Sequence, residues 1–371
     1  MKRLVFCLMV ISGFSFAFSA ELLLDKQITS KAVVLQVVSE KQENVAGSDV
    51  VAPVQILRVK ILEGGHKDQE ITFSNDFIQL KIGDSFFLHE TILADSGESM
   101  YSVSDPYRLP TIYFFTALLF FLVIIFGGKQ GVRGMISLVG SLLLIAYILL
   151  PNIIAGHNAL VVSISVSSLI IILGSYITHG FTRTTTSAVL GMIVTVLITG
   201  ILAYFATKFS MLSGFVEEET MYLNFDTKGK IDFVGLLLGG MIIGLLGVLY
   251  DAAIGQSVSV EELCKAGPHL SKIEIYKRAL RIGREHIGAL INTLAIAYVG
   301  MSLPLLLLFS MSDSHLLQIA NREVFATEII RTLVGSIGLV LAVPITTFIA
   351  TMMLYGREIQ DSRSHSHHHH H

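Results

Sequence analysis

Five polar residues lie in or beside long apolar segments of this 371-residue sequence. Their carboxylate, imidazole and amide groups can coordinate a cation, and the first two can also exchange a proton. We expect all five near one depth, close to the inner surface of a membrane. They are Asp251, Gln256, His179, Glu285 and Asn292. Together they would form a polar network for transport.

A structural role for the same side chains is the alternative. Asp251 would then only mark the inner end of a membrane span, because Asp232, 19 residues earlier, would lie about 28 Å away along a helix. The amide and imidazole groups would form hydrogen bonds between helices, worth about 0.6 kcal/mol each. Small residues continue past Asp251 to Gln256, so we expect both side chains to face protein. Ser259 to Glu262 resembles a capping box that begins a cytoplasmic helix.

The composition is that of a membrane protein. Hydrophobic residues make up 52% of the chain and charged residues 15%, against roughly 25% charged residues in soluble domains. The net charge is −3 and no basic patch favours nucleic acid. Cys7 and Cys264 are the two cysteines, too few for a disulfide framework.

The apolar segments predict a transmembrane domain over residues 111–356. Each crossing needs about 20 apolar residues, which gives seven: 111–128, 134–151, 157–178, 186–207, 231–251, 287–310 and 327–355. Basic residues then fall on the inner side, including Lys129, Arg133, Arg183 and the group between 265 and 284. We therefore predict a multi-pass protein of the cytoplasmic membrane with its C-terminus inside.

Residues before the first crossing predict an outer domain. Residues 1–19 have the basic, apolar and small-residue regions of a signal peptide, with an uncleaved anchor as the alternative. Residues 21–105 alternate short β-branched runs with turn clusters, which predicts an extracytoplasmic β domain, barrel- or sandwich-like.

Glycines predict which transmembrane helix is central. Gly235 and Gly239, and then Gly240 and Gly244, are each four residues apart. This spacing lets helices approach closely in lipid. We therefore expect the fifth crossing to be tightly packed against its neighbours, with scattered glycine as the alternative.

The last segment, 357–371, is a histidine-rich tail predicted to be cytoplasmic. It could bind a divalent metal loosely if it is native, and an engineered tag is the alternative. No other cofactor is expected. The sequence has no HExxH, GxSxG or Walker A motif, so we predict that it is not an enzyme. The tail histidines are His365, His367, His368, His369, His370 and His371.

Three long segments resemble the YibE/F-like family of bacterial integral membrane proteins. They are GGMIIGLLGVLYDAAIGQSVSVEEL (239–263), IGREHIGALINTLAIAYVGMSLPLLLL (282–308) and EIIRTLVGSIGLVLAVPITTFIA (328–350). The resemblance extends over the chain after the signal, including the β domain. It implies a multi-pass envelope protein with an extracytoplasmic domain. It assigns no catalytic residue, although Asp251, Glu285 and Asn292 lie within these segments.

Two functions from different classes fit this sequence. The first is a secondary transporter or permease-like protein for a small solute or cation, with Asp251 as its principal ionisable group. The second is a non-transporting envelope scaffold whose outer β domain binds a partner or an envelope polymer. The partners expected are the lipid bilayer, an ion or small solute, and a second copy of the chain or an envelope partner. A lipid- or envelope-modifying enzyme is a weaker third reading.

Overall fold

The computed structural model describes residues 26–44, 51–94, 97–216, 218–312 and 315–356. The predicted signal peptide and the histidine-rich tail lie outside the described residues. The chain divides into two compact units, residues 1–119 and 120–371. Each is described by itself.

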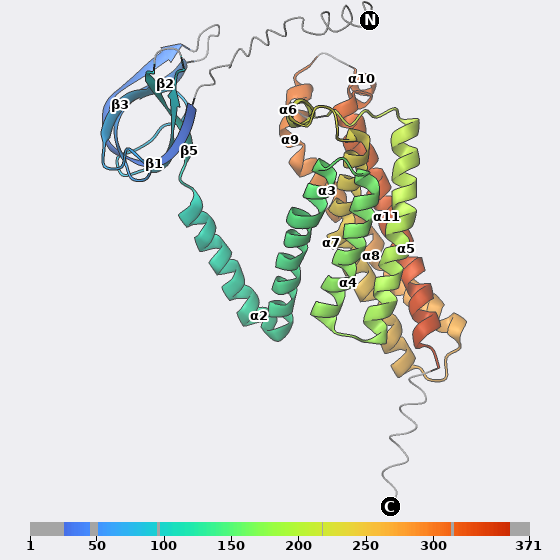
Figure 1. The fold of residues 1–371 in the computed structure, drawn as a ribbon. Coiled ribbons are helices and arrows are strands. Elements are labelled where there is room, and N and C mark those ends of the chain that lie inside the picture. The colour runs from blue at the N-terminus through green and yellow to red at the C-terminus, as the bar shows by residue number, and fades with distance from the viewer. Residues whose placement is uncertain (1–25, 45–50, 95–96, 217, 313–314, 357–371) are drawn as a thin grey trace, which may run out of the picture. The chain divides into compact units, whose positions relative to one another are not determined.

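The first unit holds a five-stranded antiparallel sheet, as the alternating runs predicted. The strands follow the order β3-β2-β1-β4-β5, and β3 approaches β5, so the sheet curls into a half-barrel (Figure 1). This is the strand order of an OB-type barrel. The strands are β1 (Lys26–Asn44), β2 (Val51–Ile61), β3 (Glu70–Asn75), β4 (Ser85–Ile92) and β5 (Ser99–Pro106).

Large apolar side chains fill the half-barrel because every second residue of a strand points inward. Phe86 and Leu88 of β4 are buried, as are Leu57 and Val59 of β2. Two shifts of register between β1 and β2 bend β1, so that it pairs with β2 on one edge and β4 on the other.

The rest of the described chain is helical. The helices α4, α5, α7, α8 and α11 pack together as a bundle (Figure 1). The elements are α2 (Leu109–Leu144), a π-helical turn η1 (Ile145–Leu149), α3 (Leu150–Ile154), α4 (Ala159–His179), α5 (Arg183–Phe209), α6 (Glu218–Asp226), α7 (Phe233–Ala266), α8 (Lys272–Met301), α9 (Leu303–Ser310), α10 (Leu316–Ala320) and α11 (Glu323–Leu354).

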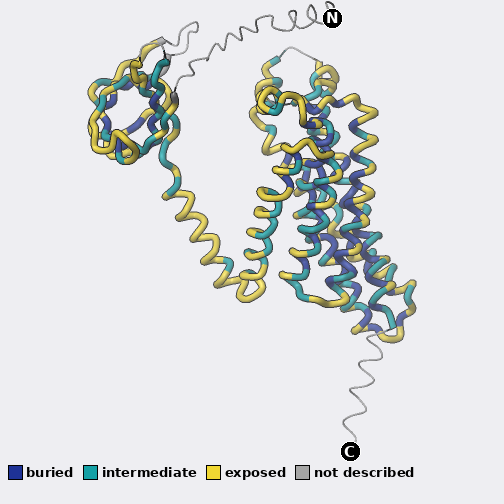
Figure 2. The backbone as a smooth tube through the Cα atoms, in the orientation of Figure 1, coloured by how far each residue is buried: buried dark blue, intermediate teal, exposed yellow. Residues whose placement is uncertain are grey.

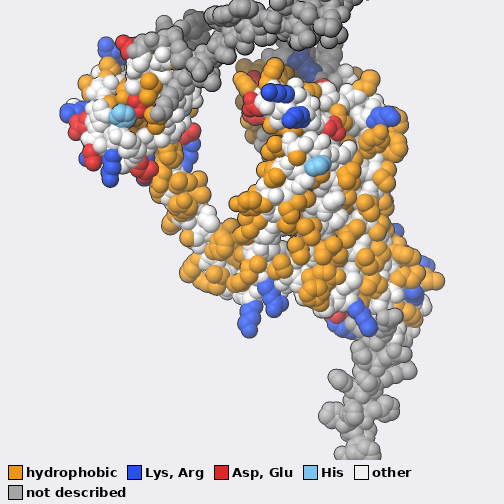
Figure 3. Space-filling model, in the orientation of Figure 1, with side chains coloured by type: hydrophobic (Ala, Val, Ile, Leu, Met, Phe, Trp, Pro, Cys, Tyr) orange, Lys and Arg blue, Asp and Glu red, His pale blue; other side chains and the backbone are white. Residues whose placement is uncertain are grey.

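Among the described residues, five helical segments are long and apolar enough to cross a membrane, or six if α8 and α9 form one span bent by 64°. The sequence had predicted seven. The difference arises in the first two predicted crossings, which belong to one helical segment, Leu109–Ile154. Figure 3 shows an apolar face along the helical unit, with Lys and Arg side chains gathered at its ends.

Segment Leu109–Ile154 is kinked at Gly128, which has a φ of 52° and a ψ of −141°. Such a conformation is open to glycine and strained for other residues. Beyond the kink the two arms of α2 touch, because a Cβ added at Gly131 would lie 2.6 Å from the carbonyl oxygen of Val123. Glycines therefore allow the chain to fold back here.

Helix α7 is the central helix of the bundle, as its glycines predicted. It contacts α4, α5, α8 and α11, and Figure 2 shows buried residues running through this region. A Cβ at Gly239 would overlap the Ser163 side chain of α4, and one at Gly244 would lie 2.6 Å from the Tyr298 hydroxyl of α8. These two glycines allow the close packing.

The C-terminal end of α7 differs from the prediction. The helix continues 15 residues past Asp251, to Ala266, so residues 259–262 lie inside it and form no capping box. Glu261 stays in the helix because it accepts a hydrogen bond from Thr184 and pairs with Lys265 one turn later. The capping box occurs instead at Ser271 and Glu274, where α8 begins.

Candidate functional site

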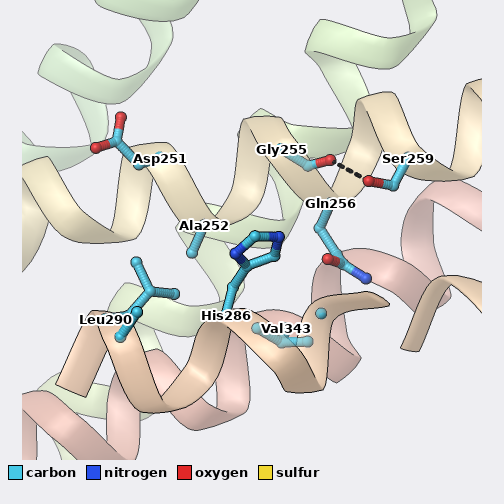
Figure 4. A pocket seen from close by; sticks show the side chains of 10 residues that line it. Asp251, Ala252, Gly255, Gln256, Ser259, His286, Leu290 and Val343 are labelled. Carbon is cyan, nitrogen blue, oxygen red and sulfur yellow. Dashed lines mark hydrogen bonds between the residues drawn. The ribbon is translucent and has the colours of Figure 1, made fainter. Parts of the chain in front are cut away.

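The predicted carboxylate lies beside a cavity of about 290 Å³ between α7, α8 and α11 (Figure 4). Helix α7 forms one wall from Asp251 to Ser259. Facing it are Gly283, His286 and Leu290 of α8. Val343 of α11, the residue before Pro344, also lines the cavity.

Polar groups at the cavity are held in two ways. The Gln256 side chain is buried, and its Nε2 donates to the carbonyl oxygen of Ala279 at 2.7 Å, which joins α7 to α8. The Ser259 hydroxyl donates back to the carbonyl oxygen of Gly255 at 2.8 Å. His286 projects from α8 toward α7 between these groups (Figure 4), so its imidazole faces the space that they surround.

A second cavity, of about 580 Å³, lies between the second arm of α2, α4 and α7. Its hydroxyl groups come from Ser137, Ser141, Thr178 and Tyr250, and the rest of its wall is largely apolar. Ile145, the first residue of the π-helical turn, also lines it. Such turns inside helices occur often at functional sites.

Asp251 lines both cavities. The first extends along α7 from Asp251 to Ser259, and the second from Asp251 back to Ile243. Together they follow the 17 residues from Ile243 to Ser259, about 24 Å along the helix axis. The Asp251 carboxylate points away from His286 in Figure 4. Asp251 is therefore the lining residue that the two cavities share.

Asp251 is more accessible than the sequence predicted. We expected its side chain to face protein, and it is exposed, whereas Gln256 is buried. Within the described residues, no ion pair neutralises the carboxylate. The carboxylate is thus exposed, and no ion pair among the described residues holds it in place.

The other three predicted residues lie apart from the first cavity. The His179 ring, at the end of α4, is tilted against the Tyr250 ring with centroids 5.9 Å apart, and His179 lies 3.3 Å from the Gln130 amide. It therefore adjoins the second cavity through Tyr250. Glu285 and Asn292 are seven residues apart on α8 and are both exposed. They share the face opposite Ala279, away from α7.

His286 was not among the predicted site residues, although the sequence contains a signal for it. Ile275, Ala279 and Gly283 are buried at intervals of four residues and mark the face of α8 that packs on the bundle. His286 and Leu290 continue that face. Periodicity along α8 therefore distinguishes His286 from its neighbour Glu285.

No group of three metal-binding side chains occurs among the residues that the structure describes. The tail histidines, for which loose metal binding was predicted, lie outside them. The chemistry available at the two cavities is therefore that of one carboxylate, one imidazole, an amide and several hydroxyl groups.

Comparison with known proteins gave one match. The family model described as YibE/F-like protein matches residues 115–356, which confirms the resemblance for the helical unit. The match begins after the β sheet, so the half-barrel lies outside it. No curated protein and no solved structure matches the chain.

Proposed function

Because the chain belongs to the YibE/F-like family and carries apolar helices typical of a membrane protein, we propose that it is a secondary transporter or permease-like protein. Its substrate would be a small solute or a cation. Asp251 would be the group whose charge changes during transport. The single observation that carries the proposal is that Asp251 lines two cavities on different sides of α7.

The position of Asp251 favours this function over a purely structural one. An ionisable residue inside a membrane span is costly and commonly marks an ion or proton pathway. A carboxylate that served only to join helices would bind a partner, as Gln256 does with Ala279. Asp251 instead opens onto two spaces on different sides of α7. It can therefore meet a cation or proton from either one.

Neighbouring groups fit a cation or proton more closely than a large solute. His286 and Gln256 line the first cavity, with Ser259. The second cavity is lined by Ser137, Ser141 and Thr178. The nitrogen and oxygen atoms of imidazole, amide and hydroxyl groups can replace water around a small cation or relay a proton. The cavities, at about 290 and 580 Å³, also suit small substrates.

The proposal includes seven crossings. The kink at Gly128 divides Leu109–Ile154 into two arms, and α8 with α9 forms a bent sixth crossing before α11. Lys129 and Arg133 then lie at an inner turn, as the positive-inside rule requires. The half-barrel would be outside and the C-terminus inside. Accessibility of tags placed before residue 26 and after residue 356 tests this topology.

Flux measurements test the transport function. The full chain is placed in proteoliposomes containing an entrapped pH-sensitive dye, and gradients of Na⁺, K⁺ or Mg²⁺ are imposed. We expect proton movement with at least one cation, falling to the level of empty vesicles for Asp251→Asn. Glu262→Gln is the matched control, because Glu262 is an exposed acid of the same helix. Equal flux in Asp251→Asn and wild type, or none in folded wild type, would overturn this proposal.

A scaffold function is the second candidate, and the half-barrel favours it. OB-type barrels often bind oligosaccharides or oligonucleotides on one face. In this reading the half-barrel binds an envelope polysaccharide and the helices anchor it. It predicts that the full chain in nanodiscs cosediments with insoluble envelope polysaccharide, that Asp251→Asn cosediments equally, and that neither moves ions. Absence of cosedimentation would remove this candidate.

A further inference from the structure

The segment that joins β3 to β4, residues 76–84, has one buried and one exposed apolar side. Leu80 is buried in the core of the half-barrel. The Gln55 side chain holds the Leu80 backbone twice, since it accepts from the N–H at 2.8 Å and donates to the carbonyl oxygen at 3.2 Å. The other large apolar residues of the segment are exposed, namely Phe77 (66%), Ile78 (37%) and Ile82 (68%). A fixed segment thus presents three apolar side chains outward.

The segment ends in a tight turn beside the point where the chain leaves the half-barrel. The Asp84 N–H donates to the Lys81 carbonyl oxygen, and the Asp84 carboxylate accepts from the Lys81 N–H. Ser85 follows as the first residue of β4. Its carbonyl oxygen accepts a hydrogen bond at 2.9 Å from the N–H of Tyr107, the residue after β5. Ile82, within the turn, therefore lies only three residues from the contact that fixes the exit of the chain.

Helix α2 begins close to that exit. Its first residue, Leu109, is two residues after Tyr107, and two residues of chain reach at most about 7 Å. The first part of α2 belongs to the same unit as the half-barrel. It opens a segment that is apolar enough to cross a membrane, and residues 112–115 (IYFF) are all more than half exposed. The apolar span therefore starts beside the end of the half-barrel that carries Ile82.

The side chains at the exit are of kinds common at a membrane surface. The Tyr107 ring packs edge-on against Phe87 with centroids 5.6 Å apart, and the Lys31 Nζ lies 3.5 Å from the Tyr107 ring centroid. Arg108 follows and pairs with Asp105 at 2.9 Å. Tyrosine is enriched at membrane–water interfaces, and long basic side chains near the ends of spans reach toward the headgroups. This end of the half-barrel is therefore suited to the lipid surface.

We propose that segment 76–84 is a membrane-contact site, at which Phe77, Ile78 and Ile82 enter the boundary between headgroups and acyl chains of the leaflet where α2 begins. The short link to α2 favours lipid over a protein partner, because α2 itself brings lipid to this end of the half-barrel. With α2 as one attachment and the segment as a second, the half-barrel would keep one orientation on the membrane. The proposal rests on α2 crossing the membrane and does not depend on transport.

Tryptophan fluorescence tests this contact, because the chain has no Trp of its own. Phe77→Trp, Ile82→Trp and Met100→Trp are made singly in the full chain. Each is placed in nanodiscs of phosphatidylcholine, either unmodified or brominated in the upper part of the acyl chains, where bromine quenches a nearby indole. Interfacial side chains lie about 5–10 Å into the boundary, so we expect brominated lipid to reduce emission at 77 and 82 at least about twofold. Met100 is 60% exposed near the other end of β5, and emission there should not change.

Two further variants make the outcome decisive. Phe114→Trp, at an exposed position of α2, should be quenched at least as strongly as Ile82→Trp, and its failure to be quenched would remove the premise that α2 lies in lipid. Ile82→Ser added to Phe77→Trp should weaken the quenching at 77, whereas Met100→Ser should not. Absence of quenching at 77 and 82, equal quenching at 100, or a blue-shifted emission without quenching, which indicates a protein partner, would each overturn the proposal.

Discussion

The contacts that stabilise the half-barrel differ in kind from those that stabilise the helical bundle. In the half-barrel, large apolar side chains such as Phe86, Leu57 and Leu88 fill the interior. The bundle instead brings glycines against hydroxyl side chains on neighbouring helices. These pairs are Gly239 with Ser163, Gly191 with Thr346, Gly338 with Thr199 and Gly174 with Ser137.

The surroundings explain this difference. In water, burial of apolar surface drives folding at roughly 25 cal/mol per Å². In lipid, a leucine gains little by leaving the acyl chains for another helix, so close backbone approach becomes the main source of attraction. Large buried side chains therefore stabilise the half-barrel, whereas small residues at helix contacts stabilise the bundle. Each of the following changes tests one side of this contrast.

Removing volume from the half-barrel should have the largest effect. Phe86→Ala deletes a fully buried ring and should cost about 3–5 kcal/mol of local stability. Hydrogen exchange of peptides from β1 and β4, measured by mass spectrometry on the full chain, reports this loss. Phe77→Ala is the control, because Phe77 is 66% exposed. Equal exchange in the two variants would contradict a core held by side-chain volume.

Adding volume to the bundle should have an intermediate effect. Gly239→Ala places a methyl group against Ser163 and should cost about 1–3 kcal/mol. The midpoint of heat unfolding in detergent measures it. Gly240→Ala is the matched control, since no atom lies within 4 Å of a Cβ there, and it should be neutral or stabilising. If both changes act alike, the glycines serve no close contact.

The smallest effect is expected at the surface of the half-barrel. Lys60 and Asp68 form an exposed ion pair at 2.8 Å, and the hydrogen bond and charge of Lys60 lower the pKa of the Asp68 carboxyl below its ordinary 3.8. A lowered pKa stabilises the fold above about pH 4, and this contribution is lost as the pH falls through the folded-state value. Asp68→Asn should therefore speed hydrogen exchange of β2 peptides slightly at pH 6 and leave it unchanged near pH 2.5.

A control variant tests whether that small effect belongs to the ion pair of Lys60 and Asp68. Asp76→Asn changes another exposed acid of the half-barrel that has no ion pair among the described residues. It should leave exchange in β2 unchanged at both values of pH. A slowing of exchange in Asp68→Asn at pH 6 would contradict a stabilising ion pair.

Much of the fold could be predicted because its causes are local. Apolar runs located the helices, and alternation located the strands. Glu328 and Arg331 are three residues apart, a spacing that favours an ion pair on a helix, and the pair is present at 3.2 Å. The glycine spacing correctly marked α7 as central, since close packing in lipid requires small residues.

The remaining features depend on contacts between distant segments. Inside α7, Glu261 accepts a hydrogen bond from Thr184 of α5, and no local pattern shows that partner. The inner and outer faces of α8 depend on how that helix rotates against α7. Glu285 and Asn292 were predicted in the network and His286 was not, although the spacing of Ile275, Ala279 and Gly283 marks the face that His286 continues. That Asp251 lines two cavities depends on four different helices and the second arm of α2.

Access of water to the cavities tests the central claim most directly. Single cysteines replace Val248, Gly255 or Leu197 in a chain lacking Cys7 and Cys264, and each variant is exposed to a charged, membrane-impermeant thiol reagent. Val248 lines the second cavity and Gly255 the first, while Leu197 is exposed on α5 and lines neither of these two cavities. We predict labelling at 248 and 255 and none at 197. If 248 and 255 react no faster than 197, no aqueous path reaches Asp251 and the proposed transport function is wrong.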